Sequence, residues 1–293
     1  MAELWRAVAA LAPGNEFLQA LAQNAFLQNA LLAGLLASLA CGVVGGYVMA
    51  RRITYIAGAI AHSVLGGMGA AGYARAVLGW DWAHPLLGAT VAALVAAGLI
   101  GVVSLRAGQR EDTVIGAIWA VGMAVGVLFI ARTPGYNSEL MSYLFGNILM
   151  VSRADLWLMA GLDAVILAVA VLFHNQLVAV CFDEEFARLR GLPVGLHYFL
   201  LLALTALTVV LLSTVVGIIM VIALLTLPAG TAASFSRRLG AIMAWAVAIA
   251  MLVTSAGLAL SFGPDLPTGA VIILLAGALY LAAAGLAWLL RRG

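Results

Sequence analysis

Long apolar runs, each separated from the next by a short polar segment, recur along the whole chain. About twenty consecutive apolar residues are needed for a helix to cross the roughly 30 Å hydrocarbon core of a bilayer. Of the 293 residues, 65% are hydrophobic and 9% are charged, whereas soluble domains carry about 25% charged residues. The sequence therefore predicts an all-α integral membrane protein, a polytopic helical bundle of about eight or nine transmembrane helices.

Charged residues, prolines and glycines divide the apolar residues into separate predicted spans. These are 21–50, 54–74, 84–105, 112–131, 154–173, 195–212, 215–232, 240–262 and 268–290. The sixth and seventh meet at Ser213 and Thr214, so they are either two helices or one long apolar stretch. Residues 1–20 are predicted as an amphipathic lead-in without the charged start and cleavage site of a secretory signal. Residues 21–293 are predicted as a single membrane domain.

The arginines predict the orientation, because cytoplasmic loops of membrane proteins are rich in basic residues. All 14 basic residues are arginine. An outside N-terminus and a cytoplasmic C-terminus place most of them inside, namely Arg51, Arg52, Arg106, Arg110, Arg188, Arg190, Arg237, Arg238, Arg291 and Arg292. This orientation requires residues 195–232 to cross twice, which favours nine spans over eight. Trp80 and Trp82 then mark the outer interface.

One ionisable side chain, His62, lies in the middle of the second predicted span. An imidazole at membrane depth is costly unless it faces protein or a water-filled path. Two interpretations are open: a ligand for a transported cation, or a neutral histidine that donates one hydrogen bond to a neighbouring helix. Asp163, in the middle of the fifth span, offers a similar choice between a ligand and a protonated or helix-paired acid with a structural role.

Other residues indicate packing, and some functions are excluded. Two pairs of glycines four residues apart, Gly42 with Gly46 and Gly122 with Gly126, are typical of close helix contacts. Cys41, in the first span, and Cys181, in a predicted polar loop, are interpreted as packing residues rather than a disulfide or metal pair. A chain without lysine cannot contain a P-loop, and no H-E-x-x-H pattern occurs. We therefore expect no enzyme activity of the chain's own and no nucleic-acid partner.

Two predicted cytoplasmic segments have the features of docking surfaces. Residues 182–193 predict a short amphipathic helix with acids first and arginines last, as the helix dipole favours, which ends at a glycine and a proline. In residues 227–239 a span is predicted to end at Pro228 and to be followed by small residues and a basic turn. A membrane subunit moved by a separate soluble motor needs such inner helices. An ordinary positive-inside connector is the alternative for the second segment.

Six segments, in order along the chain, resemble the permease subunits of bacterial zinc/manganese/iron ABC importers. They are 51–63, 111–116, 143–149, 182–193, 227–232 and 265–270. By their order and spacing, the resemblance extends over the chain from about residue 25 to its end. The C-terminal half also resembles the permeases of cobalamin and siderophore importers, so a fold of that type is expected.

The resemblance implies a multi-pass subunit of the bacterial cell membrane that moves Zn²⁺, or alternatively Mn²⁺ or Fe²⁺, into the cytoplasm. It implies a homodimer with a cytoplasmic ABC ATPase dimer below and an extracytoplasmic metal-binding protein above, and no permanently bound cofactor. The residues that it implies for coupling to the ATPase are Phe182, Glu184, Arg188, Gly191, Pro228, Arg237 and Arg238.

The chain departs from this family at one position. Many members have an aspartate four residues before the histidine, and this chain has Gly58 there. Residues four apart share a helix face, so an Asp–His pair can bind one divalent cation. Asp163 is the candidate replacement for the missing carboxylate, and His62 and Asp163 form the predicted metal site. The other acids and histidines considered, and not expected as ligands, are Glu111, Asp112, Glu139, Asp265, His84, His174 and His197.

Two alternatives to import of a bare metal ion are open. The first keeps the same machine and changes the cargo to a metal chelate such as a siderophore. The second is an ion-coupled secondary transporter in which His62 and Asp163 form a proton relay. It requires no ATPase and leaves the inner segments without a role.

Overall fold

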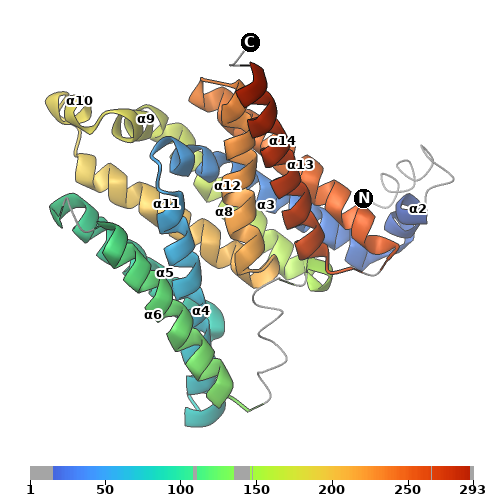
Figure 1. The fold of residues 1–293 in the computed structure, drawn as a ribbon. Helices are drawn as coiled ribbons and strands as arrows, with labels where there is room; N and C mark the ends of the chain where they lie inside the picture. Colours follow the sequence, from blue (N-terminus) through green and yellow to red (C-terminus); the bar gives the residue numbers. More distant parts are fainter. Residues whose placement is uncertain (1–15, 108–110, 135–145, 147, 265, 291–293) are drawn as a thin grey trace.

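The computed structural model describes residues 16–107, 111–134, 146, 148–264 and 266–290. Within them, long helices run back and forth through the molecule (Figure 1). These are α3 (Ala25–Ala50), α4 (Thr54–Leu78), α5 (Pro85–Ala107), α6 (Glu111–Arg132), α8 (Arg153–Leu172), α11 (Val194–Val215), α12 (Ile218–Phe235), α13 (Leu239–Phe262) and α14 (Thr268–Leu290). The short elements are α2 (Glu16–Gln23), η2 (Ile148–Met150), α9 (His174–Phe182) and α10 (Glu184–Leu189). The expected all-α bundle is confirmed.

Eight of these helices are long and apolar enough to cross a membrane. The exception among the long helices of the described residues is α4, which has 25 residues. Its glycines, His62 and Arg75 lower its apolar content, but at 1.5 Å per residue its length is sufficient for a crossing. The nine spans predicted from the sequence thus correspond to nine helices, one of which is less apolar than the rest.

Two predicted boundaries are wrong. The first span was predicted to begin at residue 21, but α2 ends at Gln23 and Asn24 caps α3, its side chain accepting a hydrogen bond from the Phe26 N–H at 2.9 Å. A side-chain oxygen at this position satisfies a backbone donor that the first turn leaves unpaired. The second wrong boundary is the one between the sixth and seventh predicted spans. The chain breaks between α11 and α12 at Val216 and Gly217 rather than at Ser213 and Thr214, because Gly217 adopts a φ of +87°.

The predicted end of a span at Pro228 is also wrong. Helix α12 continues through this proline to Phe235. Proline inside a helix removes one backbone hydrogen bond and disturbs the preceding turn. Here Pro228 and the following Ala229 and Gly230 are buried, and the helix packs against α3, α13 and α14. Tertiary packing therefore carries the helix past its proline.

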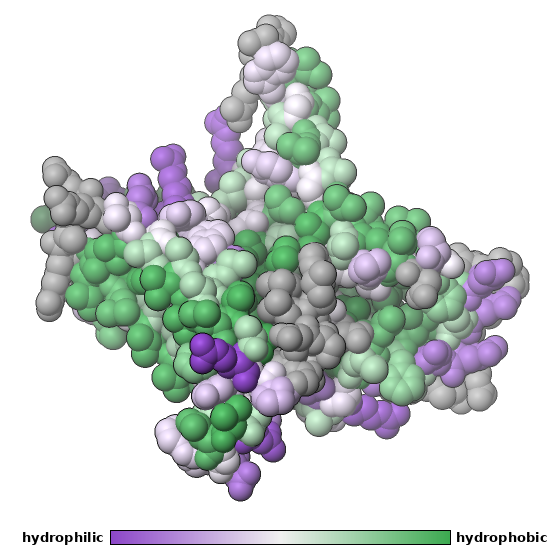
Figure 2. Space-filling model, turned by 60° about the horizontal axis from the view of Figure 1, so that its bottom comes forward, coloured by the Kyte–Doolittle hydropathy of each residue, from purple (hydrophilic) through white to green (hydrophobic). Residues whose placement is uncertain are grey.

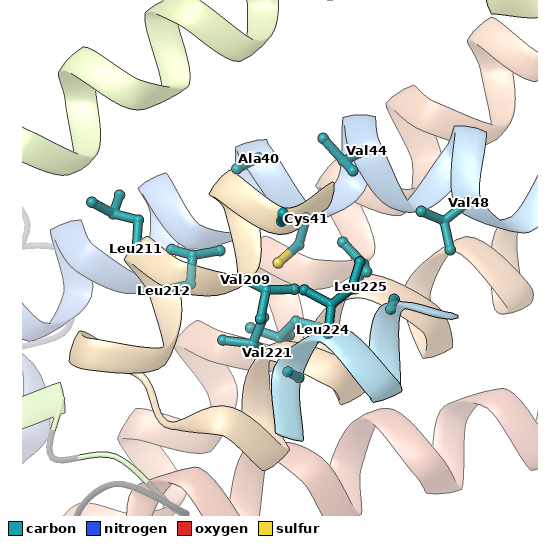
Figure 3. Close-up of a cluster of buried hydrophobic side chains, with 14 of the residues drawn as sticks. Ala40, Cys41, Val44, Val48, Val209, Leu211, Leu212, Val221, Leu224 and Leu225 are labelled. Atoms are coloured by element: carbon teal, nitrogen blue, oxygen red, sulfur yellow. The ribbon is translucent and has the colours of Figure 1, made fainter. Parts of the chain in front are cut away.

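Helix α3 lies at the centre of the core. It packs against α8, α11, α12 and α13, and Figure 3 shows Cys41 among apolar side chains that include Val209 and Leu224. Cys41 and Cys181 are both free and buried, which agrees with a packing role. Cys181 was predicted in a polar loop, but it lies in α9, where the helix packs on α3 and α11.

Both predicted glycine pairs lie at close helix contacts. A Cβ atom at Gly42 would be 2.6 Å from the Val247 backbone nitrogen on α13, and one at Gly46 would be 2.5 Å from Met243. At the α4–α6 contact, a Cβ atom at Gly122 would be 2.8 Å from Ser63 Cα, and one at Gly66 would be 2.7 Å from the Gly122 carbonyl oxygen. Only glycine permits these helix backbones to approach so closely.

The surface of the molecule is mainly apolar. Figure 2 shows hydrophobic residues over most of one face, with hydrophilic residues gathered at its periphery. Exposed large apolar side chains occur on most long helices, including Leu128 on α6, Val171 on α8 and Leu281 on α14. Without a surrounding apolar phase such faces would be costly in water, so this surface fits a protein embedded in lipid.

Candidate functional site

His62 packs against an aromatic side chain of the neighbouring helix. Its ring stacks on Trp119 of α6, with ring centroids 4.8 Å apart and planes 25° from parallel. The Nδ1 atom of His62 is buried and has no hydrogen-bond partner within the described residues. A buried polar atom without a partner is costly. The structural interpretation from the sequence, a hydrogen bond to a neighbouring helix, is therefore not fulfilled at Nδ1.

The space beside Gly58 is filled by the same tryptophan. A Cβ atom at Gly58 would lie 2.5 Å from Trp119 Cζ3 and 2.6 Å from Cη2. No side chain fits at residue 58 while the indole of Trp119 stays where it is. Trp119 thus occupies the place that a side chain at position 58 would take, on the same face of α4 as His62.

A partly open cavity of about 460 Å³ lies next to this tryptophan. Its walls come from the end of α3 and from α4, α6, α12 and α14. The side chains with polar groups or aromatic faces include Tyr55, Trp119, Thr226 and Tyr280. The cavity offers a space of suitable size for a hydrated cation between the His62-bearing helix and α12, the helix that leads to the basic turn.

Asp163 lies in different surroundings. It is 4% exposed, and its Oδ2 atom is buried without a hydrogen-bond partner in the described part of the chain. Helix α8 packs against α3, α9 and α11, whereas α4 packs mainly against α5, α6, α11 and α12. The described contacts thus place His62 against α6 and Asp163 against α3. Nor do the described residues contain a group of three or more His, Cys, Asp or Glu side chains able to hold a metal ion.

The other histidines have local partners. His84 accepts a hydrogen bond from the Leu86 N–H at 3.3 Å. The Nδ1 atom of His174 lies 2.8 Å from the Tyr47 hydroxyl, and that of His197 lies 3.0 Å from the Pro193 carbonyl oxygen. Each of the three histidines at span edges thus has a local contact at its Nδ1 atom.

The predicted inner amphipathic helix is present as α10. Asp183 caps it by accepting a hydrogen bond from the Phe186 N–H at 2.9 Å, and Gly191, with a φ of +76°, ends the segment that follows. Phe182 and Phe186 are 64% and 48% exposed, so two apolar side chains face outward at this end of the molecule. They form a surface that a partner can cover.

Glu184, in contrast, is held from within the chain. It forms an ion pair with Arg51, at the end of α3, and its second oxygen lies 3.9 Å from Arg188. Arg51 also donates a hydrogen bond to the Val180 carbonyl oxygen at 3.3 Å and lies 5.4 Å from the centroid of the Tyr198 ring. This network joins the link before α4 to α9, α10 and α11. The pair of arginines at positions 51 and 52 was noticed in the sequence, but the partner of Arg51 lies too far along the chain to be predicted.

The second inner segment divides into a buried and an exposed part. Pro228 is buried inside α12, so any effect of this residue on coupling is indirect. Arg237 and Arg238 are exposed in the link between α12 and α13. Figure 1 shows α10 at the upper left of the molecule and the end of α12 toward its top, where α14 ends.

Two segments that carried the family resemblance meet at the opposite end. Gly146 and Ile148 line a cavity of about 130 Å³ together with Leu266 and Pro267, beside the break between α11 and α12. Gly146 has a φ of +74°, and a Cβ atom there would lie 2.1 Å from the Val216 carbonyl oxygen. A side chain is impossible at this contact. Glu139 and Asp265, two of the acids that were not expected to be ligands, lie outside the described residues.

Comparison with known proteins places these features in a family. The model of the ABC 3 transport family matches residues 23–287. The chain belongs to the ABC 3 transport family. It is 41% identical, over 86% of its length and 85% of the relative's, to a probable metal transport system membrane protein of Chlamydia pneumoniae. It is 34% identical, over 90% of its length and 88% of the relative's, to the manganese transport system membrane protein MntC of Halalkalibacterium halodurans.

Solved structures support the same assignment. PsaBC from Streptococcus pneumoniae in complex with Fab is 30% identical, with a TM-score of 0.80 over 92% of this chain and 94% of that one. An inward-facing putative metal-chelate type ABC transporter has a TM-score of 0.67 at 15% identity, which shows a shared fold alone. The resemblance predicted from the six segments is confirmed: the chain is a multi-pass permease of a metal ABC transporter.

Proposed function

We propose that this permease carries zinc into the cytoplasm and that His62 is the ligand that the ion meets inside the membrane. The observation that carries the proposal is the buried Nδ1 atom of His62, which has no hydrogen-bond partner in the described residues and lies next to the Trp119 wall of a cavity. An imidazole lone pair is a suitable ligand for a divalent transition metal.

Zinc is the first candidate because His62 supplies an imidazole nitrogen and stacks on Trp119, and the described residues contain no group of three or more His, Cys, Asp or Glu side chains around it. Nitrogen ligands suit zinc and other late transition metals, whereas manganese prefers oxygen ligands. Manganese is the second candidate, and the name of the Halalkalibacterium relative favours it. Iron is a third. A site with few protein ligands also suits transport, because a closed four-ligand zinc site would retain its ion.

The permease is proposed to work as a homodimer with an ATPase dimer on the cytoplasmic side and a metal-binding protein outside. In this arrangement Phe182, Phe186 and the turn at Arg237 and Arg238 face the ATPase, and the N-terminus lies outside. The exposure of these side chains supports the docking assignment. ATP hydrolysis by the partner would move α10 and α12 and so open the path past His62 toward the cytoplasm.

Uptake of metal by starved cells tests the proposal. Cells starved of zinc and manganese would express the permease with its ATPase and binding protein, as wild type, as His62→Ala, or with an inactive ATPase. We expect zinc accumulation that falls at least about tenfold with either change, since loss of a metal ligand costs at least as much as loss of a residue that supports one. His84→Ala is the matched control and should leave uptake unchanged.

Each other outcome identifies a different error. Uptake that persists with the inactive ATPase contradicts ATP-driven import and favours the secondary transporter. Uptake that persists in His62→Ala but is lost with the inactive ATPase contradicts the ligand assignment and favours a chelate or a site elsewhere. Accumulation of manganese in place of zinc corrects the cargo and leaves the machine intact.

A further inference from the structure

Three aromatic rings lie in one stack along the N-terminal half of α4. Trp119 lies 5.2 Å from the ring of Tyr55, with planes 35° apart, and 4.8 Å from the ring of His62. Tyr55 and His62 are seven residues apart, so they lie two turns apart on one face of α4. The indole of Trp119 therefore lies between them.

Gly58 lies between these two residues along the same helix face and makes room for the indole. The two ring atoms 2.5 and 2.6 Å from a Cβ atom at this position show that the ring packs directly on the α4 backbone. The register of α6 is set one turn further on, where Gly122 packs against Ser63. The tryptophan is thus held against α4 by a contact between two helix backbones.

Trp119 also forms part of the cavity wall. The cavity is lined by Tyr55, Gly58 and Trp119 on one side and by residues of α12 and α14 on the other. His62 is not among the lining residues, although its ring contacts the indole. In this arrangement the indole lies between the cavity and the imidazole.

We propose that Trp119 controls access to His62: the indole must leave its position on Gly58 before a divalent cation in the cavity can reach the imidazole. Trp119 is then a positioning residue rather than a ligand, and the pair formed by Gly58 and Trp119 sets how exposed His62 is. The nature of the cation rests on the proposed function, but access to position 62 can be measured without transport.

Cysteine accessibility tests this proposal directly. His62→Cys is introduced into the full chain, purified with its partner subunits, with and without Trp119→Ala. The probe is a small cationic methanethiosulfonate reagent, and the parent chain, whose two native cysteines are buried, gives the background. Because thiol reactivity follows exposure, we expect modification of Cys at position 62 to be about tenfold faster or more when Trp119 is truncated.

Two further variants separate access from loss of structure. Trp157→Ala removes an exposed tryptophan of α8 and should leave the rate unchanged. Gly58→Ala pushes the indole away from α4 and should also raise the rate, by a smaller factor. A rate that is unchanged in Trp119→Ala overturns the proposal, as does an equal rise in Trp157→Ala, which would indicate general loosening.

The result is separable from the uptake test. If the cysteine rates behave as expected while wild-type cells accumulate no metal, the cargo assignment is wrong and the role of Trp119 in access stands. If uptake depends on His62 while truncation of Trp119 leaves the rate unchanged, the ligand assignment stands and the access role is wrong.

Discussion

His62 and Asp163, the two residues of the predicted metal site, lie in differently built parts of the bundle. His62 is half-buried at the tight α4–α6 contact, beside an aromatic stack and a partly open cavity. Asp163 is 4% exposed on a helix that packs against the central α3. Each has a buried polar atom without a partner in the described residues, so an unsatisfied atom alone does not distinguish them. What distinguishes them is the neighbouring space through which a cation can arrive.

We propose that this difference gives the two residues different roles. A transport ligand needs both a lone pair and a path, and His62 has a lone pair and a cavity on the far side of the movable Trp119 ring. Asp163 has the lone pair but is enclosed, which favours the structural interpretation that the sequence left open. The following experiments test that division, beginning with the largest expected effect.

The largest effect should follow from filling the glycine contact between α4 and α6. Gly122→Leu places a side chain where Ser63 Cα lies 2.8 Å from the Cβ position, and overpacking of this kind costs about 3 kcal/mol or more. We expect little folded protein in the membrane, measured by fluorescence-detected size-exclusion chromatography.

Gly161→Leu is the matched control on α8, because no atom lies within 4 Å of its Cβ position. Its yield and elution should equal those of wild type. Equal losses in both variants would contradict the distinction between a tight α4–α6 contact and an open face on α8.

A smaller effect is expected when the carboxylate of Asp163 is neutralised. Asp163→Asn keeps the shape of the side chain, so zinc uptake per folded molecule should stay within about twofold of wild type. Uptake is measured with the radioactive metal and normalised to permease in the membrane. A loss as large as that of His62→Ala would instead make Asp163 a ligand.

The ion pair between Arg51 and Glu184 connects the two regions, since α10 follows α8 and α9 in the chain and Arg51 precedes α4. The two side chains are 22% and 26% exposed, so we expect a coupling free energy of about 1 kcal/mol. Arg51→Glu and Glu184→Arg should each lower the midpoint of thermal unfolding, and the double variant should recover part of the loss. Arg52→Glu is the control for added negative charge, and a double variant no better than the singles would contradict direct pairing.

The last test introduces no substitution and concerns Cys181, which follows α8 and reports on the enclosed region. Burial raises the pKa of its thiol to about 12, although Arg51 lowers it in part. Because the raised pKa leaves less thiolate at pH 8 than in an ordinary thiol of pKa about 8.5, alkylation by iodoacetamide should be about a hundredfold slower or more than for an exposed cysteine. The chain denatured in detergent is the positive control, and rapid labelling of the native chain would show that this region is open.

Apolar runs predicted the helices well because about twenty apolar residues have few alternatives to a membrane span. The same reasoning failed at Asn24 and Pro228, where a cap and buried small residues decided the boundary. His62 was identifiable because it is ionisable at membrane depth. Trp119 was not, since its place over Gly58 depends on the register of α6 against α4. The partner of Glu184 could not be predicted because it lies 133 positions away in the sequence.

The most direct measurement of the central claim is X-ray absorption at the zinc edge, on the full complex trapped with zinc during ATP hydrolysis. We predict nitrogen scattering at about 2.0 Å with the multiple-scattering pattern of imidazole. This pattern should be lost in His62→Ala and unchanged in Asp163→Asn. A His62→Ala spectrum identical to that of wild type, or loss of a ligand in Asp163→Asn, would contradict the assignment of His62 as the zinc ligand within the membrane.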